Sequence, residues 1–270
     1  MVSMPAIIRE ISCKSALNKT KIPGYDYCMN PYVGCTHGCV YCYASFMCRF
    51  TDHREGWGEF LDVKMNFPQV LAKQLGSSKA GLAGKVLLGT VTDAYQPVEA
   101  HYRITRSCLG ILEGFPELEV HILTKSALVE RDVEILARMR GCEVGFTVTT
   151  MDPDVARVIE PGASLPRQRL DTAVEMKKAG IDVWVFIAPV LPGLTDTGES
   201  LSSLFSALRS RGIGDIQVDC LNPYASVSHR LRNVYRDHFP HALPVLEEYL
   251  RDPGRYKREM ASRIRRLSGR

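Results

Sequence analysis

The stretch EVHILTKSALVERDVEILARMRGCEVGFTVTT, residues 119–150, contains the pattern that decides the fold. EVHILT (119–124) is a short apolar run that predicts a buried strand, and CEVGFTVTT (142–150) predicts a second one. Between them, LVERDVEILARMR (128–140) has apolar residues three and four apart, which predicts a helix. Because a crossover helix carries the chain back to the start of the sheet, the two strands are expected to pair in parallel.

The same alternation extends to both sides of this stretch. Further strands are predicted at KVLLGTV (85–91), DVWVFIAPV (182–190) and DIQVDCL (215–221). Further helices are predicted around Ile104, Cys108, Ile111 and Leu112, at 166–180 and at 198–212. With one more strand leading into a cysteine-rich loop, the chain has about six β/α units. We therefore expect an α/β fold, a partial (β/α)6 TIM-like barrel of parallel strands, with active groups where the strands end.

Three segments follow from this organisation. Residues 1–24 are expected to form an N-terminal extension, 25–222 the partial barrel, and 223–270 a C-terminal helical, basic segment. The last twenty residues, RDPGRYKREMASRIRRLSGR, are strongly basic and nearly devoid of acids. They indicate either contact with a polyanion or, more commonly, a solvated helical tail.

The composition bounds the class of protein. Of 270 residues, 45% are hydrophobic and 24% charged, which is typical of a soluble globular protein. No run approaches the roughly 20 apolar residues of a membrane span, and no secretory signal pattern is visible, so we expect a cytoplasmic protein without a membrane partner. In that compartment, nine cysteines indicate thiols or metal ligands rather than a disulfide framework. A net charge of +4 is too small to indicate nucleic-acid binding by itself.

The segment CTHGCVYCYA (35–44) carries Cys35, Cys39 and Cys42 on one short loop. Thiolates at this spacing can converge on a single inorganic centre. An iron–sulfur cube normally has four cysteine ligands, so three would leave one iron open to a small molecule.

Zinc is the alternative chemistry for this loop. A structural zinc site is closed by four ligands, and His37 or Cys28 could supply the fourth. Such a chain would be a zinc-stabilised, non-catalytic binding protein. For either centre, Gly34 and Gly38 would let the backbone wrap the metal closely.

The spacing CxxxCxΦC, with Tyr41 as the aromatic residue, resembles the cluster loop of the radical SAM superfamily. The ordered motifs NPYVGCTHGCVYCYA, GTVTDAYQPVE, TKSALVERD, IEPGASLPRQRL and APVLPG resemble the branch related to spore photoproduct lyase, mostly its members without an assigned substrate. The resemblance covers about residues 25–200. It implies a [4Fe–4S] cluster on Cys35, Cys39 and Cys42, with S-adenosylmethionine on the open iron. Reductive cleavage would then produce a 5′-deoxyadenosyl radical that abstracts hydrogen from an unidentified substrate.

The resemblance also implies roles for residues outside the cysteines. The residues expected to bind the cofactor are Tyr41 near the adenine, Thr92 and Asp93 at the amino group, Lys125 at the carboxylate, Thr147 at polar atoms, and Pro189 beside the adenine. Tyr43 is grouped with the cluster cysteines as a catalytic residue, although simple packing is an equal alternative. For Thr92 and Asp93 the alternative is an ordinary turn.

Five further residues have open roles. Glu160 and Arg169 could bridge each other or meet the cofactor, and Glu99 and His101 could face the substrate. His37 could tune the cluster or donate a proton, but a histidine on the loop surface is the simpler expectation.

The expected partners are an external electron donor such as flavodoxin or ferredoxin, and a substrate that is a small molecule or a nucleic acid. The reaction type, lyase or transferase, stays open, and a DNA photoproduct lyase-like repair enzyme or a member without turnover are alternatives. Spore photoproduct lyase uses a cysteine as hydrogen donor between the cluster loop and the second strand, where this chain has only Cys48. The WGEF segment (57–60) and the chain beyond Leu221 have no counterpart, and both are expected to close the barrel mouth.

Overall fold

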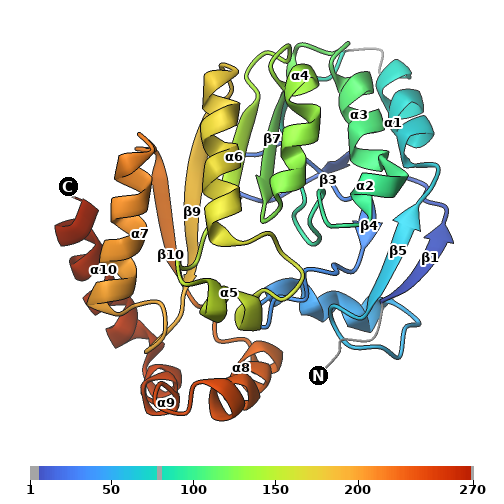
Figure 1. Cartoon of the computed structure of the whole chain (residues 1–270). Coiled ribbons are helices and arrows are strands. Elements are labelled where there is room, and N and C mark those ends of the chain that lie inside the picture. Colours follow the sequence, from blue (N-terminus) through green and yellow to red (C-terminus); the bar gives the residue numbers. More distant parts are fainter. Residues whose placement is uncertain (1–5, 78–80, 269–270) are drawn as a thin grey trace.

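The computed structural model describes residues 6–77 and 81–268, and within them a seven-stranded sheet forms the centre of the molecule (Figure 1). The strand order is β10-β9-β8-β7-β6-β3-β2. The strands are β2 (Asn18–Lys19), β3 (Tyr27–Met29), β6 (Gly84–Leu88), β7 (Leu118–Thr124), β8 (Glu143–Thr147), β9 (Asp182–Val190) and β10 (Ile216–Cys220). All neighbours pair in parallel except β2, which is antiparallel to β3. The predicted parallel α/β sheet is therefore confirmed.

Helices cover the outer face of this sheet (Figure 1). They include α1 (Phe67–Gly76), α3 (Ile104–Leu112), α6 (Pro166–Lys178) and α7 (Gly198–Ser210), with the short α2 (Glu99–Tyr102) before α3. The helices predicted around 104–112, at 166–180 and at 198–212 are confirmed. Their apolar sides and the sheet form one continuous core of aliphatic residues.

The prediction of one regular α-helix over 128–140 is wrong. The chain forms a 3-10 helix, η2 (Ala127–Asp132), followed by the single turn α4 (Val133–Leu136). At their junction Asp132 has φ −107° and ψ 14°, outside helical values. Its buried carboxylate accepts hydrogen bonds from Arg106 Nη1 at 2.6 Å and Arg131 Nη2 at 2.7 Å. The helix is interrupted where the buried Asp132 carboxylate pairs with these two arginines. Apolar spacing alone does not reveal such a break.

The number of six regular strand–helix units is not established. Short helices replace a full crossover helix between β7 and β8. Between β3 and β6 the chain passes through a second sheet of order β1-β5-β4, formed by β1 (Ile7–Ile11), β4 (Tyr32–Val33) and β5 (Phe60–Lys64). Within the predicted extension 1–24, residues 1–5 lie outside the described residues. Strand β1 belongs to the second sheet and β2 to the seven-stranded sheet.

The carboxyl ends of the parallel strands lie on the lower side in Figure 1, beside α5 (Pro153–Ile159) and α8 (Ala225–His238). The chain after Leu221 is helical and continues with α9 (Leu243–Arg251) and α10 (Pro253–Ser268). A second apolar core joins α8 and α9 to the cysteine loop through Cys39 and Tyr41. The C-terminal helices thus support the loop from behind. In the described part of the chain, no helix has the length and apolar character needed to cross a membrane.

Candidate active site

A cavity of about 380 Å³ opens at the carboxyl ends of the parallel strands. Every residue predicted to bind the cluster or the cofactor lines this cavity: Cys35, Cys39, Tyr41, Cys42, Tyr43, Thr92, Asp93, Lys125, Thr147 and Pro189. These residues come from the cysteine loop and from the ends of four neighbouring strands. The tertiary structure therefore gathers in one place a set that is spread over 155 positions of sequence, from 35 to 189.

The three loop cysteines are free thiols in a largely dry setting. Cys35 and Cys39 are buried and Cys42 is half-buried. Two turns shape the loop, with Gly38 N donating to Cys35 O at 3.2 Å and Cys42 N donating to Cys39 O at 3.1 Å. Burial raises the pKa of the Cys39 thiol and raises that of Cys42 to about 11. Thiolates at these positions thus need a positively charged partner, which a bound metal centre supplies.

The two side chains considered as a fourth zinc ligand have other positions. Cys28 lies on β3, paired with Leu87 of β6, and His37 Nδ1 faces Asp93. Within residues 6–77 and 81–268, no three His, Cys, Asp or Glu side chains come together closely enough to hold one metal ion.

Neighbouring segments press closely on the backbone of the cysteine loop. A Cβ on Gly58 would lie 2.8 Å from Gly38 Cα, and a Cβ on Gly162 would lie 2.1 Å from Thr36 O. Gly162 N also donates a hydrogen bond to His37 O at 3.0 Å. Both contacts require glycine because a methyl group would meet backbone atoms that cannot rotate away. The WGEF and IEPGAS motifs therefore act as supports for the loop.

The TDAYQP motif supports the loop from a third side. Thr92 Oγ1 donates to Gly34 O at 2.6 Å and accepts from Gln96 Nε2 at 3.1 Å. The fully buried Gln96 accepts from Thr36 N at 2.9 Å. The hydroxyl of Thr92 thus already has a donor and an acceptor within the protein. No signal in the sequence indicated this role of Gln96, although the residue lies inside the TDAYQP motif.

Asp93 is also engaged by the protein. Its Oδ1 accepts from Tyr95 N at 2.9 Å and Thr124 Oγ1 at 2.7 Å, and its Oδ2 accepts from Lys125 N at 2.9 Å. His37 Nδ1 lies 3.3 Å from Asp93 Oδ2, within ion-pair distance. This aspartate therefore fastens the second and third strand ends to the cysteine loop.

His37 and Asp93 form a buried acid–base pair. Burial lowers the pKa of His37, but the Asp93 carboxylate outweighs this and raises it to about 9. Burial raises the pKa of Asp93, and His37 outweighs this and holds it below the usual range. The expectation of a histidine on the loop surface is wrong, since His37 is only 1% exposed.

Lys125 brings a cation to the cavity wall. Burial lowers the pKa of Lys125, but nearby Cys39, Asp93 and Glu160 outweigh this and raise it above the usual value, so the amine stays protonated. In the described part of the chain no carboxylate lies within ion-pair distance of Lys125 Nζ, and the residue forms its hydrogen bonds through its backbone, to Asp93 Oδ2 at 2.9 Å and from Ser164 N at 3.1 Å. A cation in this position suits a ligand carboxylate.

Glu160 and Arg169 bridge each other inside the protein. Both are at most 2% exposed, and Arg169 Nη2 donates to Glu160 Oε2. The Tyr41 hydroxyl donates to the other oxygen of Glu160, and Arg169 Nη1 donates to Thr147 O at 2.8 Å. This network ties the aromatic residue of the cysteine loop to the end of β8. The pair lies behind the cavity wall, and its role is structural.

The remaining candidates divide clearly. Tyr43 lines the cavity, donates its hydroxyl to Thr90 O and is 48% exposed. Glu99 and His101 are not at the cavity: Glu99 is fully buried and accepts from Arg131 Nη2 at 2.8 Å, whereas His101 packs on its neighbour Tyr102. The expectation that they face this cavity is wrong, because the chain leaves the cavity after Asp93, and Glu99 and His101 lie beyond it in α2.

Trp57 of the WGEF segment and Asn222, beyond Leu221, line the cavity, and both belong to segments that were expected to close its mouth. Asp219, Cys220 and Leu221, at and after the end of β10, also line it and were not singled out from the sequence. The only available signal was that β10 ends there, since strand ends collect site residues. Cys48 lies in the 3-10 helix η1 (Tyr43–Phe50) and is not among the residues that line the cavity.

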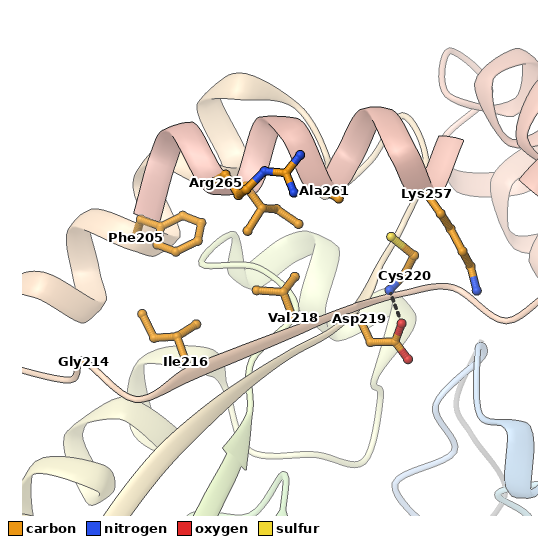
Figure 2. Close-up of a pocket in the computed structure, with 10 residues that line it drawn as sticks. Phe205, Gly214, Ile216, Val218, Asp219, Cys220, Lys257, Ala261 and Arg265 are labelled. Carbon is orange, nitrogen blue, oxygen red and sulfur yellow. Dashed lines mark hydrogen bonds between the residues drawn. The ribbon is translucent and has the colours of Figure 1, made fainter. Parts of the chain in front are cut away.

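A second cavity of about 480 Å³ lies on the outer side of β10. Figure 2 shows it between β10 and α10, with Phe205 of α7 at one end and Lys257 of α10 at the other. The Cys220 sulfur lies on the α10 side, and Asp219 and Cys220 line both cavities.

Comparison with known proteins identifies the class to which this site belongs. The sequence profile of the radical SAM superfamily matches residues 29–202, so the chain is a member of that superfamily. Members bind a [4Fe–4S] cluster and S-adenosylmethionine, and the resemblance stated from the motifs is confirmed.

Three particular relatives illustrate the branch. The chain is 35% identical to an uncharacterised protein of Methanocaldococcus jannaschii over 189 residues, 70% of each protein. It is 27% identical over 185 residues, 67% of this chain, to the radical SAM Nα-GlyT isomerase of Pseudomonas phage M6, of which it spans 36%. The structure of spore photoproduct lyase complexed with dinucleoside spore photoproduct superposes with a TM-score of 0.64 at 15% identity, over 85% of this chain and 66% of the lyase.

Proposed function

We propose that Cys35, Cys39 and Cys42 hold a [4Fe–4S] cluster and that the cavity beside them binds S-adenosylmethionine. The bound pair supplies reductive cleavage of the sulfonium to a 5′-deoxyadenosyl radical, which removes hydrogen from a substrate. One observation carries this proposal: every residue predicted to bind the cluster or the cofactor lines a single cavity of about 380 Å³. The electron would come from an external one-electron donor such as flavodoxin or ferredoxin.

The residues of the chain have distinct tasks in this proposal. Lys125 binds the cofactor carboxylate because its ammonium group lies at the cavity wall, and among the described residues no carboxylate lies within ion-pair distance of it. Thr92 and Asp93 contribute mainly by fixing the loop, since the protein already occupies their side chains. Tyr41, held through Glu160, keeps one wall of the cavity in place. Cys35 and Cys39 are buried and Cys42 is half-buried, which limits access of water to the cluster.

The test is anaerobic reconstitution with iron and sulfide, reduction by dithionite, and chromatography for 5′-deoxyadenosine. Wild-type protein should bind about four irons per chain and produce 5′-deoxyadenosine. Cys39→Ala should lose both, whereas Cys13→Ala, a half-buried cysteine outside the cavity, should keep both. A colourless wild-type protein with one zinc would instead support the zinc-stabilised binding protein. A fully loaded wild-type protein that leaves S-adenosylmethionine intact would contradict the enzymatic proposal.

A second proposal concerns a nucleic-acid substrate, favoured by exposed aromatic rings at the cavity mouth. Tyr43 lines the cavity, its ring stacks on Phe46, and Phe46 meets Phe50, which is 71% exposed. Arg49 lies 5.9 Å from the Phe50 ring centre. Aromatic rings combined with arginine form the stacking surfaces that bind single-stranded nucleic acids.

A labelled single-stranded oligonucleotide tests this second proposal. Its affinity should fall steeply with added salt, since phosphate contacts release counterions, and Phe50→Ser should weaken it. Val245→Ser, at a 38% exposed apolar residue on α9, is the control. Binding that is equal in both variants, or insensitive to salt, would contradict a nucleic-acid substrate.

A further inference from the structure

Arg230 lies where α8 packs against η1, in the part of the chain for which the superfamily motifs have no counterpart. Its Nη2 donates a hydrogen bond of 2.9 Å to the backbone oxygen of Cys42. The residues are 188 positions apart in sequence, so this contact exists only in the folded protein. It joins the C-terminal helices directly to a predicted cluster ligand.

The guanidinium group of Arg230 is incompletely paired. Its Nε is buried and has no hydrogen-bond partner within the described residues. In the described part of the chain, no carboxylate lies within ion-pair distance of this half-buried guanidinium, and its hydrogen bond goes to the backbone oxygen of Cys42.

The other arginines on α8 differ from Arg230. Arg232 forms an ion pair with Glu247 at 2.7 Å, and Arg236 is exposed and donates to Asn233 Oδ1 at 3.1 Å. Burying a charge without a counter-charge costs free energy. The position of Arg230 is therefore best explained by negative charge that appears at the cysteine loop.

We propose that Arg230 is a positioning residue that holds a fixed positive charge beside Cys42 and thereby raises the midpoint reduction potential of the cluster. The inference rests on the proposed function, because it requires a [4Fe–4S] centre on the loop cysteines. One-electron reduction by an external reductant adds one negative charge to a centre already ligated by thiolates, with no bond or proton transferred. A nearby cation stabilises the reduced form more than the oxidised form, so removing it makes the potential more negative. Second-sphere groups tune metal centres in this way.

The experiment is a redox titration of reconstituted protein, followed by electron paramagnetic resonance of the reduced cluster. Arg230→Met should shift the midpoint potential to more negative values and Arg230→Gln should do the same. Arg230→Lys, which keeps the charge, should stay near the wild type. Arg236→Met removes the same charge from an exposed position on the same helix and should leave the potential unchanged.

Each outcome separates this inference from the proposed function. A wild type that takes up no [4Fe–4S] cluster would defeat the proposed function itself. A loaded wild type whose potential is matched by loaded Arg230→Met and Arg230→Gln would overturn the inference alone. If the neutral variants bind less than a tenth of the iron while Arg230→Lys loads fully, the potential of the small loaded fraction decides: a more negative midpoint supports the inference, and a wild-type midpoint overturns it. If Arg230→Lys also fails to bind the cluster, the guanidinium group is needed for the structure of the loop rather than for its charge, and the inference is overturned.

Discussion

Replacing Gly162 by alanine is expected to displace the cysteine loop. The added Cβ would lie 2.1 Å from Thr36 O and 2.9 Å from His37 Cα, more than an ångström short of the 3.4 Å at which ordinary contact with that oxygen begins. Both neighbours are backbone atoms, so no side-chain rotation relieves the clash. Forcing extra volume into a well-packed site costs about 1–3 kcal/mol. In a domain of this size, that lowers the melting temperature by roughly 2–12 °C.

The displacement should also reduce metal binding, because sites tolerate about 0.5 Å of ligand misplacement. The assays are thermal unfolding of cluster-free protein and iron content after anaerobic reconstitution. Gly110→Ala in α3 is the matched control: its Cβ would meet nothing within 4 Å, and alanine in a helix is favoured by about 0.5–1 kcal/mol. Wild-type melting temperature and iron content in Gly162→Ala would refute the role of this contact.

Three further changes test other parts of the site. Glu160→Gln should lower the free energy of unfolding in urea by about 3–5 kcal/mol, since it leaves the buried Arg169 charge uncompensated. A decrease below about 1 kcal/mol would contradict a stabilising ion pair. The pKa of Asp132 is lowered, because nearby arginines outweigh the opposing effect of burial. The ionised Asp132 therefore stabilises the fold at pH values above its pKa in the unfolded chain, about 3.9. This stabilisation is lost as the pH falls through the lower pKa of the folded protein. The stability difference between wild type and Asp132→Asn should accordingly shrink between about pH 5 and pH 2, and a constant difference would oppose this. Lys125→Met should weaken binding of S-adenosylmethionine about 10- to 150-fold in calorimetry, with iron content unchanged, and equal affinity would exclude the proposed contact.

Much of the fold follows from local sequence patterns. Apolar runs such as 182–190 coincide with strands, here β9, because a strand buried on both faces needs a continuous apolar sequence. The break of the predicted helix at Asp132 could not be found this way, since one of the two arginines that pair with Asp132, Arg106, lies 26 positions away in sequence. Pairing of an acid with a distant base depends on the packed structure and leaves no periodic trace.

The site divides along the same line. The sequence alone predicted Cys35, Cys39 and Cys42 as the cluster ligands and predicted the strand ends that surround them, because short-range spacing and strand order carry that information. Only the tertiary structure revealed that Gly162, Gln96 and Arg230 hold the loop, since those contacts join residues far apart in the chain. It also showed that Asp93 mainly fastens the loop, because hydrogen-bond partners are decided by which groups meet when the sheet closes around them.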